Sequence, residues 1–237
     1  MKLRWIPNIL TMGNLTCGFM SVVFASFNTS EGYVVGAVLI LVAALLDGLD
    51  GQVARWLRVS SPVGKELDSL ADSVAFGVAP GYLAYVTYLS GTDALVFGRS
   101  IDLGVPIAAI FPVCAAYRLA RFNVQSSSDS FTGLPSPVAG ILVALAPICL
   151  PHVHIPTPLF ASMFSLVGFL MVSTVRYSKP QSFILKNLHG FRLAGLVVLV
   201  GLLLLLFKFW VIFLFIGLYV LSGLLTFVIQ FIEDHRY

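Results

Sequence analysis

The chain has 237 residues, of which 58% are hydrophobic and 11% are charged, and its mean hydropathy is +0.95. A soluble domain carries about 25% charged residues, so the composition excludes a soluble globular protein and indicates an integral membrane protein. The formal net charge of +3 comes without a basic run or an acidic tail. We therefore expect no nucleic-acid partner.

Eight apolar segments are long enough, alone or with a polar extension, to cross a bilayer core, which needs about 20 helical residues. They run approximately over Ile9–Phe27, Tyr33–Leu46, Leu67–Leu89, Val105–Leu119, Pro137–Pro151, Leu159–Val175, Leu193–Phe207 and Phe209–Phe231. This pattern predicts an all-α fold, a polytopic transmembrane bundle of about eight helices.

The last two segments are separated only by Lys208. One helix over both would be about 65 Å long, more than twice the hydrocarbon thickness, so we predict a tight hairpin. The expected organisation is a six-helix membrane domain over residues 1–190 and a two-helix transmembrane extension over residues 191–237.

The basic residues fall on one side of this predicted topology. With the N-terminus inside, the outer side holds Arg99 and Lys208, and the inner side holds the other twelve of the 14 Lys and Arg residues. This bias follows the positive-inside rule. It predicts a multi-pass protein of an inner or plasma membrane, with both termini in the cytoplasm.

Four aspartates lie at the cytoplasmic ends of the second and third segments. Asp47 and Asp50 are three residues apart, and Asp68 and Asp72 are four apart, so each pair shares one helix face. The Ser-Ser-Pro-Val-Gly sequence at residues 60–64 predicts the turn that brings the pairs opposite one another. Ionisable side chains at such depth indicate function. Divalent cations would relieve their repulsion, and oxygen ligands suit Mg²⁺, Mn²⁺ or Ca²⁺ rather than zinc.

Small residues and one arginine continue the face of the first aspartate pair. Gly51 and Ala54 follow at helical spacing, and Arg55 lies one turn beyond Gly51. Small side chains leave room for a phosphate-bearing ligand near the backbone, and a guanidinium group is a planar, permanent cation suited to phosphate. The alternative is structural, because small residues also allow close helix packing and arginines reach toward lipid headgroups.

The string from Asp47 to Asp72 reads Asp-x2-Asp-Gly-x2-Ala-Arg-x8-Gly-x3-Asp-x3-Asp. It resembles the signature of the CDP-alcohol phosphatidyltransferases at every fixed position. The resemblance implies an integral membrane enzyme that transfers a phosphate-bearing group from a CDP-linked donor to an alcohol and releases CMP. It also implies two divalent ions, Mg²⁺ or Mn²⁺, bound by Asp47, Asp50, Asp68 and Asp72.

The same resemblance implies roles for individual residues. Asp72 would be the general base, and a base is needed because a hydroxyl is a weak nucleophile. The residues that would line the pocket for cytidine and diphosphate are Gly51, Ala54, Arg55 and Ser61. Thr11 and Asn14, on the first helix, are further candidates to contact the cytidine of CDP-diacylglycerol. The alternative is that these two side chains hydrogen-bond between helices.

Three further segments are similar to the membrane-integrated phosphatidylserine synthases of bacteria and archaea. They are Ile6–Gly18, Ala75–Pro80 and the region from Tyr117 to Pro137. This similarity implies CDP-diacylglycerol as donor and L-serine as acceptor. Arg118 and Arg121 are the candidates for binding the serine carboxylate, since arginine can bind a carboxylate through two N–H groups. The alternative is that both are ordinary cytoplasmic anchors.

Three other functions are alternatives to serine transfer. The same chemistry with glycerol 3-phosphate or an inositol phosphate as acceptor is the main alternative, because basic residues near 118–121 and 176–186 could bind a second phosphate. A cation transporter would need acidic residues at mid-membrane on several helices, whereas these lie at one face beside Arg55. A scaffold without activity would not need the complete signature. The expected partners are CDP-diacylglycerol, L-serine and membrane lipid, with a homodimer along residues 202–206 as a conceivable assembly.

Overall fold

The computed structural model describes residues 5–59, 61–96, 99–124, 131–151, 153–177 and 209–234. Over these ranges the chain forms seven continuous helices and four short strands. Three helices, Trp5–Ala25, Ser30–Leu57 and Gly104–Val124, are long and apolar enough to cross a membrane. The predicted all-α, polytopic membrane fold is therefore confirmed. The predicted segment Leu193–Phe207, the hairpin, the boundary at residue 190 and the suggested dimer contact lie outside the described residues.

The first two helices form an antiparallel pair. Helix α1 (Trp5–Ala25) is followed by a turn in which Asn28 adopts a left-handed conformation, with φ of 54°. Helix α2 (Ser30–Leu57) then begins at an N-cap, where the Thr29 hydroxyl accepts a hydrogen bond from the Gly32 N–H at 3.0 Å. The polar stretch around Asp47 and Asp50 is thus the last part of a long membrane helix, as predicted.

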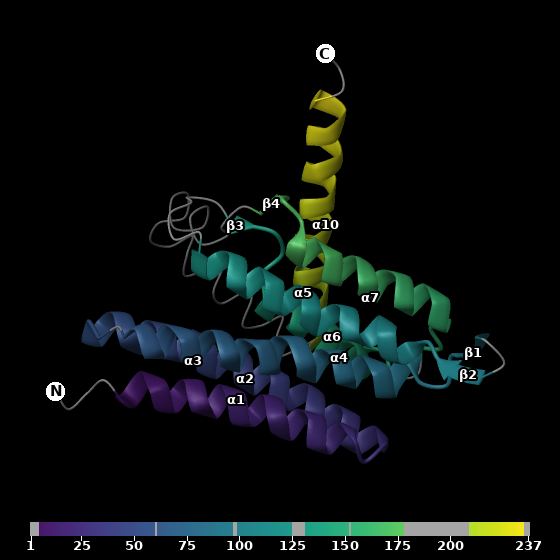
Figure 1. The fold of residues 1–237 in the computed structure, drawn as a ribbon, viewed down its shortest axis with the longest axis horizontal. Coiled ribbons are helices and arrows are strands. Elements are labelled where there is room, and N and C mark those ends of the chain that lie inside the picture. The colour runs from purple at the N-terminus through teal and green to yellow at the C-terminus, as the bar shows by residue number, and fades with distance from the viewer. Residues whose placement is uncertain are drawn as a thin grey trace.

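The third predicted segment is a continuous helix with two π-helical stretches. It runs through α3 (Pro62–Ser73), η1 (Val74–Val78), α4 (Ala79–Ala84) and η2 (Tyr85–Leu89). Ser61 caps its start by accepting a hydrogen bond from the Gly64 N–H at 2.9 Å. The first π stretch begins two residues after Asp72, and such stretches often lie beside functional sites because they re-aim the side chains around them. Figure 1 shows α3 and α4 between the α1–α2 pair and α5.

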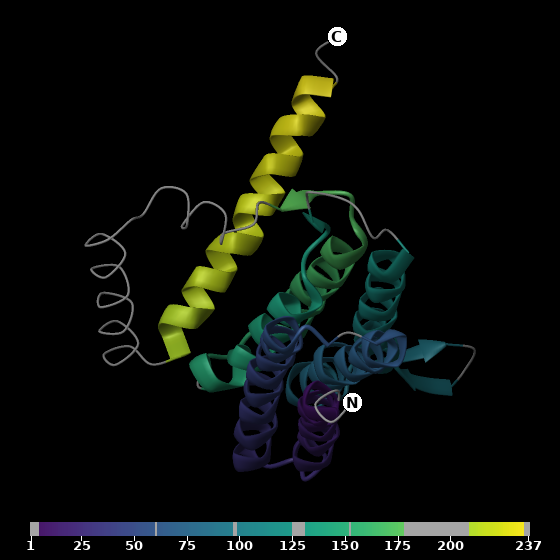
Figure 2. The same ribbon diagram turned by 90° about the vertical axis from the view of Figure 1, so that its left-hand side faces the viewer.

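The remaining elements include two small sheets that the sequence did not indicate. Strands β1 (Asp93–Val96) and β2 (Arg99–Asp102) form an antiparallel pair before helix α5 (Gly104–Val124). Strands β3 (Phe131–Thr132) and β4 (Arg176–Tyr177) pair around helices α6 (Ser136–Cys149) and α7 (Thr157–Val172). The last described element is helix α10 (Phe209–Asp234), which packs against α6 and crosses the other helices steeply (Figures 1 and 2).

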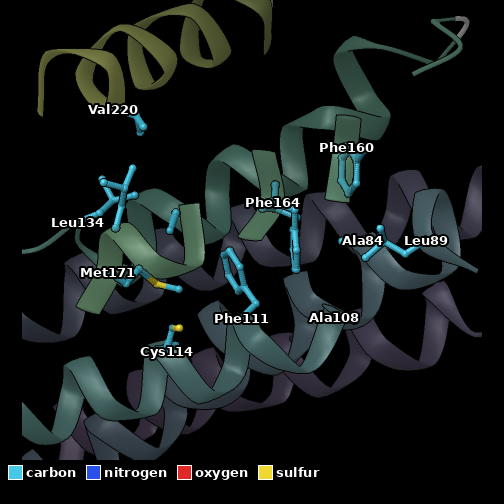
Figure 3. Packing of buried hydrophobic residues seen from close by; sticks show 14 of the residues in the cluster. Ala84, Leu89, Ala108, Phe111, Cys114, Leu134, Phe160, Phe164, Met171 and Val220 are labelled. Carbon is cyan, nitrogen blue, oxygen red and sulfur yellow. The ribbon is translucent and has the colours of Figure 1, made fainter. Parts of the chain in front are cut away.

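Two hydrophobic clusters hold these layers together. One joins α5, α6 and α7, where Phe111 stacks on Phe164 with ring centroids 4.9 Å apart, and α10 contributes Val220 to it (Figure 3). The other joins α1, α2, η1 and α4 around Ile40 and Phe76. The aspartates lie at one end of this second layer, so their relative positions depend on how α1, α2 and α3 pack.

Candidate active site

The four predicted aspartates meet where α2 ends and α3 begins. One carboxylate oxygen from each of Asp47, Asp50 and Asp68 lies within 4.8 Å of the other two. Asp72 lies one turn after Asp68, and its carboxyl group is near enough to Asp47 for the two to interact. Asp50 and Asp72 are only 6% and 8% exposed. The helical spacings in the sequence therefore predicted this juxtaposition correctly.

The arrangement of carboxylates fits a divalent cation. Asp68 is repelled by Asp50 and Asp47, and Asp72 is repelled by Asp47, Asp68 and Asp50. Oδ1 of Asp68 is buried and has no hydrogen-bond partner in the described part of the chain. Several carboxylate oxygens in close contact are the donor set that hard divalent ions prefer, and an ion would offset both the repulsion and the unpaired oxygen.

Two side chains of α1 hold two of these carboxylates by hydrogen bonds between helices. Thr11 Oγ1 donates to Asp50 Oδ2 at 2.7 Å, and Asn14 Nδ2 donates to Asp72 Oδ1 at 3.1 Å. Both donors are buried. Of the two interpretations of Thr11 and Asn14, interhelical bonding is the one that these contacts match, and it gives both residues the task of orienting a functional carboxylate.

A cavity of about 210 Å³ opens beside the aspartates. Four of the predicted donor-binding residues line this cavity, together with two of the aspartates. Other lining residues were not predicted from the sequence. The complete lining is Pro7, Asn8, Thr11, Asp50, Gly51, Ala54, Val59, Ser61, Gly64, Lys65 and Asp68. Lys65 and Asn8 are the notable additions, because both offer N–H donors to an anionic or nucleotide ligand. Their positions, next to Gly64 and three residues before Thr11, were the available signals.

Arg55 lies at the edge of this cavity and is exposed. A Cβ atom added at Gly51 would stand 3.5 Å from Nη1 of Arg55, so the guanidinium group folds back over Gly51. The guanidinium group thus lies beside Gly51, a residue that lines the cavity. The predicted roles of Gly51, Ala54, Arg55 and Ser61 in donor binding stay predictions that this arrangement allows.

The two arginines of α5 have different hydrogen-bond partners. Arg118 is 8% exposed, donates from Nη1 to Ser136 Oγ at 2.8 Å, and interacts electrostatically with Asp72. Arg121 donates to the backbone carbonyls of Val172 at 2.8 Å and Ser173 at 3.2 Å, which ties α5 to the end of α7. The structure therefore buries Arg118 against the start of α6, within the electrostatic influence of Asp72, and bonds Arg121 to the backbone at the end of α7. Serine binding stays a prediction for both.

Comparison with known proteins agrees with this site. The model of the CDP-alcohol phosphatidyltransferase family matches residues 4–176, which include all four aspartates. The chain belongs to the CDP-alcohol phosphatidyltransferase family. Together with this family membership, the apolar helices and the acidic cluster are consistent with a membrane enzyme that binds divalent metal.

Individual relatives narrow the comparison. The chain is 40% identical over 178 residues to a CDP-diacylglycerol–serine O-phosphatidyltransferase of Helicobacter pylori, which covers 72% of this chain and 70% of the relative. It is 34% identical over 234 residues to the enzyme of that name from H. pylori strain J99. This similarity covers 96% of the chain and 92% of the relative. The enzyme of that name from Methanocaldococcus jannaschii is 35% identical to the chain over 178 residues. This similarity covers 75% of the chain and 76% of the relative.

The contact between Thr11 and Asp50 leads to a first prediction. Thr11→Val keeps the shape of the side chain but removes the donor to Asp50, and we expect about a tenfold weaker affinity for Mn²⁺, since outer partners of metal ligands typically contribute 10- to 100-fold. The affinity can be measured by titrating the purified protein with Mn²⁺ and following free ion by electron paramagnetic resonance. Thr16→Val is the matched control, because the exposed hydroxyl of Thr16 bonds to the Met12 carbonyl of its own helix. Equal affinities in the two variants would contradict the prediction.

Proposed function

We propose that this protein is a phosphatidylserine synthase, which transfers the phosphatidyl group of CDP-diacylglycerol to the hydroxyl of L-serine and releases CMP. The observation that carries the proposal is the meeting of Asp47, Asp50, Asp68 and Asp72 beside a cavity. Relatives that carry this activity in their names, with similarity over as much as 96% of the chain, support serine as the acceptor.

The donor would bind with its cytidine diphosphate in the cavity and its acyl chains in the surrounding lipid. Gly51 and Ala54 leave space along α2, while Thr11 and Ser61 offer hydroxyl groups to the nucleotide. Arg55 and Lys65 supply positive charge for the diphosphate. Two ions, Mg²⁺ or Mn²⁺, held by Asp47, Asp50, Asp68 and Asp72, would neutralise the phosphate charge and bring the attacking and leaving oxygens together.

The acceptor would be activated by Asp72. Its carboxylate takes the proton from the serine hydroxyl as that oxygen forms a bond to the phosphorus attached to diacylglycerol. The bond between this phosphorus and the oxygen of CMP breaks, and CMP leaves with the electron pair. Asn14 holds the Asp72 carboxyl in one orientation through its bond to Oδ1. Arg118, which interacts with Asp72, would bind the carboxylate of serine.

We further propose that the site faces the cytoplasm and that both termini lie there. Basic side chains gather at the end of the bundle that carries the aspartates. Lys65 donates to the Asn123 carbonyl at 3.3 Å, and Arg121 binds carbonyls at the end of α7. Such an end is the cytoplasmic one by the positive-inside rule. Residues 1–190 would form the catalytic membrane domain and residues 191–237 an extension of it.

The activity is tested with detergent-purified protein, CDP-diacylglycerol, Mn²⁺ or Mg²⁺, and one acceptor at a time. We expect CMP release that depends on L-serine and phosphatidylserine as the lipid product, with chromatography of the lipids and of CMP as the readout. Release with glycerol 3-phosphate but not serine would replace the proposed acceptor. No release with any acceptor, from folded protein that binds Mn²⁺, would contradict the proposal altogether.

A further inference from the structure

A second cavity, of about 450 Å³, lies at the end of α2 that is remote from the aspartates. Its polar wall comes from the start of α2, from the π-helical stretch η2 and from the connection between α6 and α7, through Ser30, Tyr33, Thr87, Tyr88 and His154 among others. Tyr88 is held in place by stacking on Phe160, with ring centroids 4.2 Å apart. None of the residues proposed above for donor or acceptor binding lines this cavity.

The cavity lies about one membrane thickness from the active site. Ser30 is the first residue of α2, and Asp47 follows 17 residues later in the same helix. At about 1.5 Å per residue the two are about 26 Å apart along the helix axis, close to the roughly 30 Å of a hydrocarbon core. The cavity is therefore at the headgroup level of the leaflet opposite the aspartates. Its ligand is a molecule other than the one bound at the aspartates.

Two kinds of hydroxyl group line this cavity. Those of Tyr33 and Thr87 donate to the carbonyls of Val86 and Leu83 at 3.3 and 2.7 Å, so their lone pairs are left to accept from a ligand. The other kind makes no hydrogen bond within the described residues and can donate to a ligand; this kind comprises Ser30, Tyr88 and Thr157. The cavity thus suits a ligand that has both hydrogen-bond acceptors and hydrogen-bond donors.

An apolar groove continues from the cavity along α2. Ser30, Glu31, Val34 and Val35 line the groove, and Ser30 and Val34 line the cavity as well. Val34 and Val35 are 40% and 38% exposed on a helix that is long and apolar enough to cross a membrane. Glu31 places an exposed carboxylate in the first turn of this helix. A polar cavity, a neighbouring carboxylate and an apolar groove together match a lipid with a cationic group in its headgroup.

We propose that this cavity binds a phospholipid of the leaflet opposite the aspartates, and that the headgroup of this lipid carries a primary ammonium group. The phosphate accepts hydrogen bonds from the hydroxyls of Ser30 and Thr157. The ammonium group donates to the carboxylate of Glu31, and one acyl chain lies along Val34. The proposal does not rest on the transfer reaction, so it holds whichever alcohol is the acceptor at the aspartates.

The test compares two lipids that differ in the N–H groups of their headgroups. Detergent-purified protein is titrated with dioleoyl phosphatidylethanolamine or with dioleoyl phosphatidylcholine, and bound lipid is followed by native mass spectrometry. We expect phosphatidylethanolamine to bind about fivefold more tightly, the upper range for an exposed ion pair, because a quaternary ammonium group has no N–H to donate. Glu31→Gln should bring the two affinities within about twofold of each other.

Asp93→Asn is the matched control. It makes the same change of charge on an exposed carboxylate of strand β1, which follows η2 at the same end of the bundle, and it should keep the preference of the unaltered protein. Equal affinities of the unaltered protein for the two lipids would overturn the proposal, as would the same preference in Glu31→Gln and Asp93→Asn. Displacement of the lipid by an equal concentration of glycerophosphoethanolamine, which has no acyl chains, would also overturn it, because the groove would then take no part in binding.

Discussion

Asp72→Asn is expected to lower serine-dependent CMP release by about 10³-fold, within the range that general bases contribute. The amide has the size of the carboxyl group but accepts no proton from the serine hydroxyl, and it carries no charge. The site can still bind substrate because Asp47, Asp50 and Asp68, whose oxygens lie within 4.8 Å of one another, are intact. The rate is measured as CMP formed under saturating serine, donor and Mn²⁺.

Asp93→Asn is the matched control, since Asp93 lies in the exposed β1–β2 hairpin outside the site. It should keep the activity of the unaltered protein. A tenth or more of that activity in Asp72→Asn would contradict the role of Asp72 as base. Folding of the variant is checked by its elution and melting temperature in detergent.

Asp72 is also a predicted metal ligand, so the base and ligand roles need separate tests. Asp68→Asn removes a predicted ligand from the three-carboxylate group and should raise the Mn²⁺ concentration needed for half-maximal activity. Excess Mn²⁺ should restore much of its rate. The same excess should leave Asp72→Asn inactive, because a missing proton acceptor is not replaced by a more fully bound ion. Recovery of Asp72→Asn by Mn²⁺ would assign Asp72 to metal binding alone.

The sequence predicted the part of the site that depends on local helix geometry. Spacings of three and four residues placed the four aspartates on two facing helix ends, and one carboxylate oxygen from each of Asp47, Asp50 and Asp68 lies within 4.8 Å of the other two. Helical periodicity fixes which residues share a face, and a short turn fixes which faces meet. These features needed no knowledge of the rest of the fold.

Helical spacing does not predict the contacts between segments that are distant in the sequence. The partners of Asp50 and Asp72 are 39 and 58 residues away in the sequence. Which hydroxyl or amide meets which carboxylate is decided by the rotation of α1 against α2 and α3, and no spacing reports this rotation. The π-helical stretches after Asp72 likewise depend on packing.

The two arginines of α5 illustrate the same limit. Residues three apart differ by about 60° around a helix axis, so spacing allowed both to face one pocket. In the fold, this difference separates Arg118, which donates a hydrogen bond to Ser136, from Arg121, which binds the carbonyls of Val172 and Ser173. The position of α7 determines which of the two arginines finds backbone carbonyls to bind. Because α7 lies about 40 residues further along the chain, the spacing within α5 could not predict this.

Gly18 of α1 packs closely against the third helix, and we expect a side chain at this position to disturb both stability and activity. A Cβ atom there would stand 2.7 Å from the Ala75 Cα, too close for any backbone atom. Gly18 lies one turn after Asn14, and Ala75 lies three residues after Asp72. The methyl group of Gly18→Ala would therefore push the helices apart directly beside the bond from Asn14 to Asp72, which is 3.1 Å long.

Two opposing effects decide the outcome of Gly18→Ala. Alanine favours a helix over glycine by about 1 kcal/mol, whereas overpacking costs typically 1–3 kcal/mol. The atoms that the new methyl group would meet belong to a backbone, so the clash can be removed only by a shift of a whole helix. We therefore expect the cost of overpacking to exceed the gain in helix propensity, and the melting temperature to fall. Activity should fall further, by about 10²-fold, because a displacement of about 1 Å at a catalytic group has that effect.

Gly217→Ala is the matched control for this change. It is the same substitution within a helix, and a Cβ atom at Gly217 meets nothing within 4 Å. Gly217→Ala therefore gains helix propensity without overpacking. The melting temperature and kcat of this variant should equal or exceed those of the unaltered protein. If Gly18→Ala kept both values as well, α1 would be able to move away from Ala75 without displacing Asn14. The bond from Asn14 would then not be what fixes the position of Asp72.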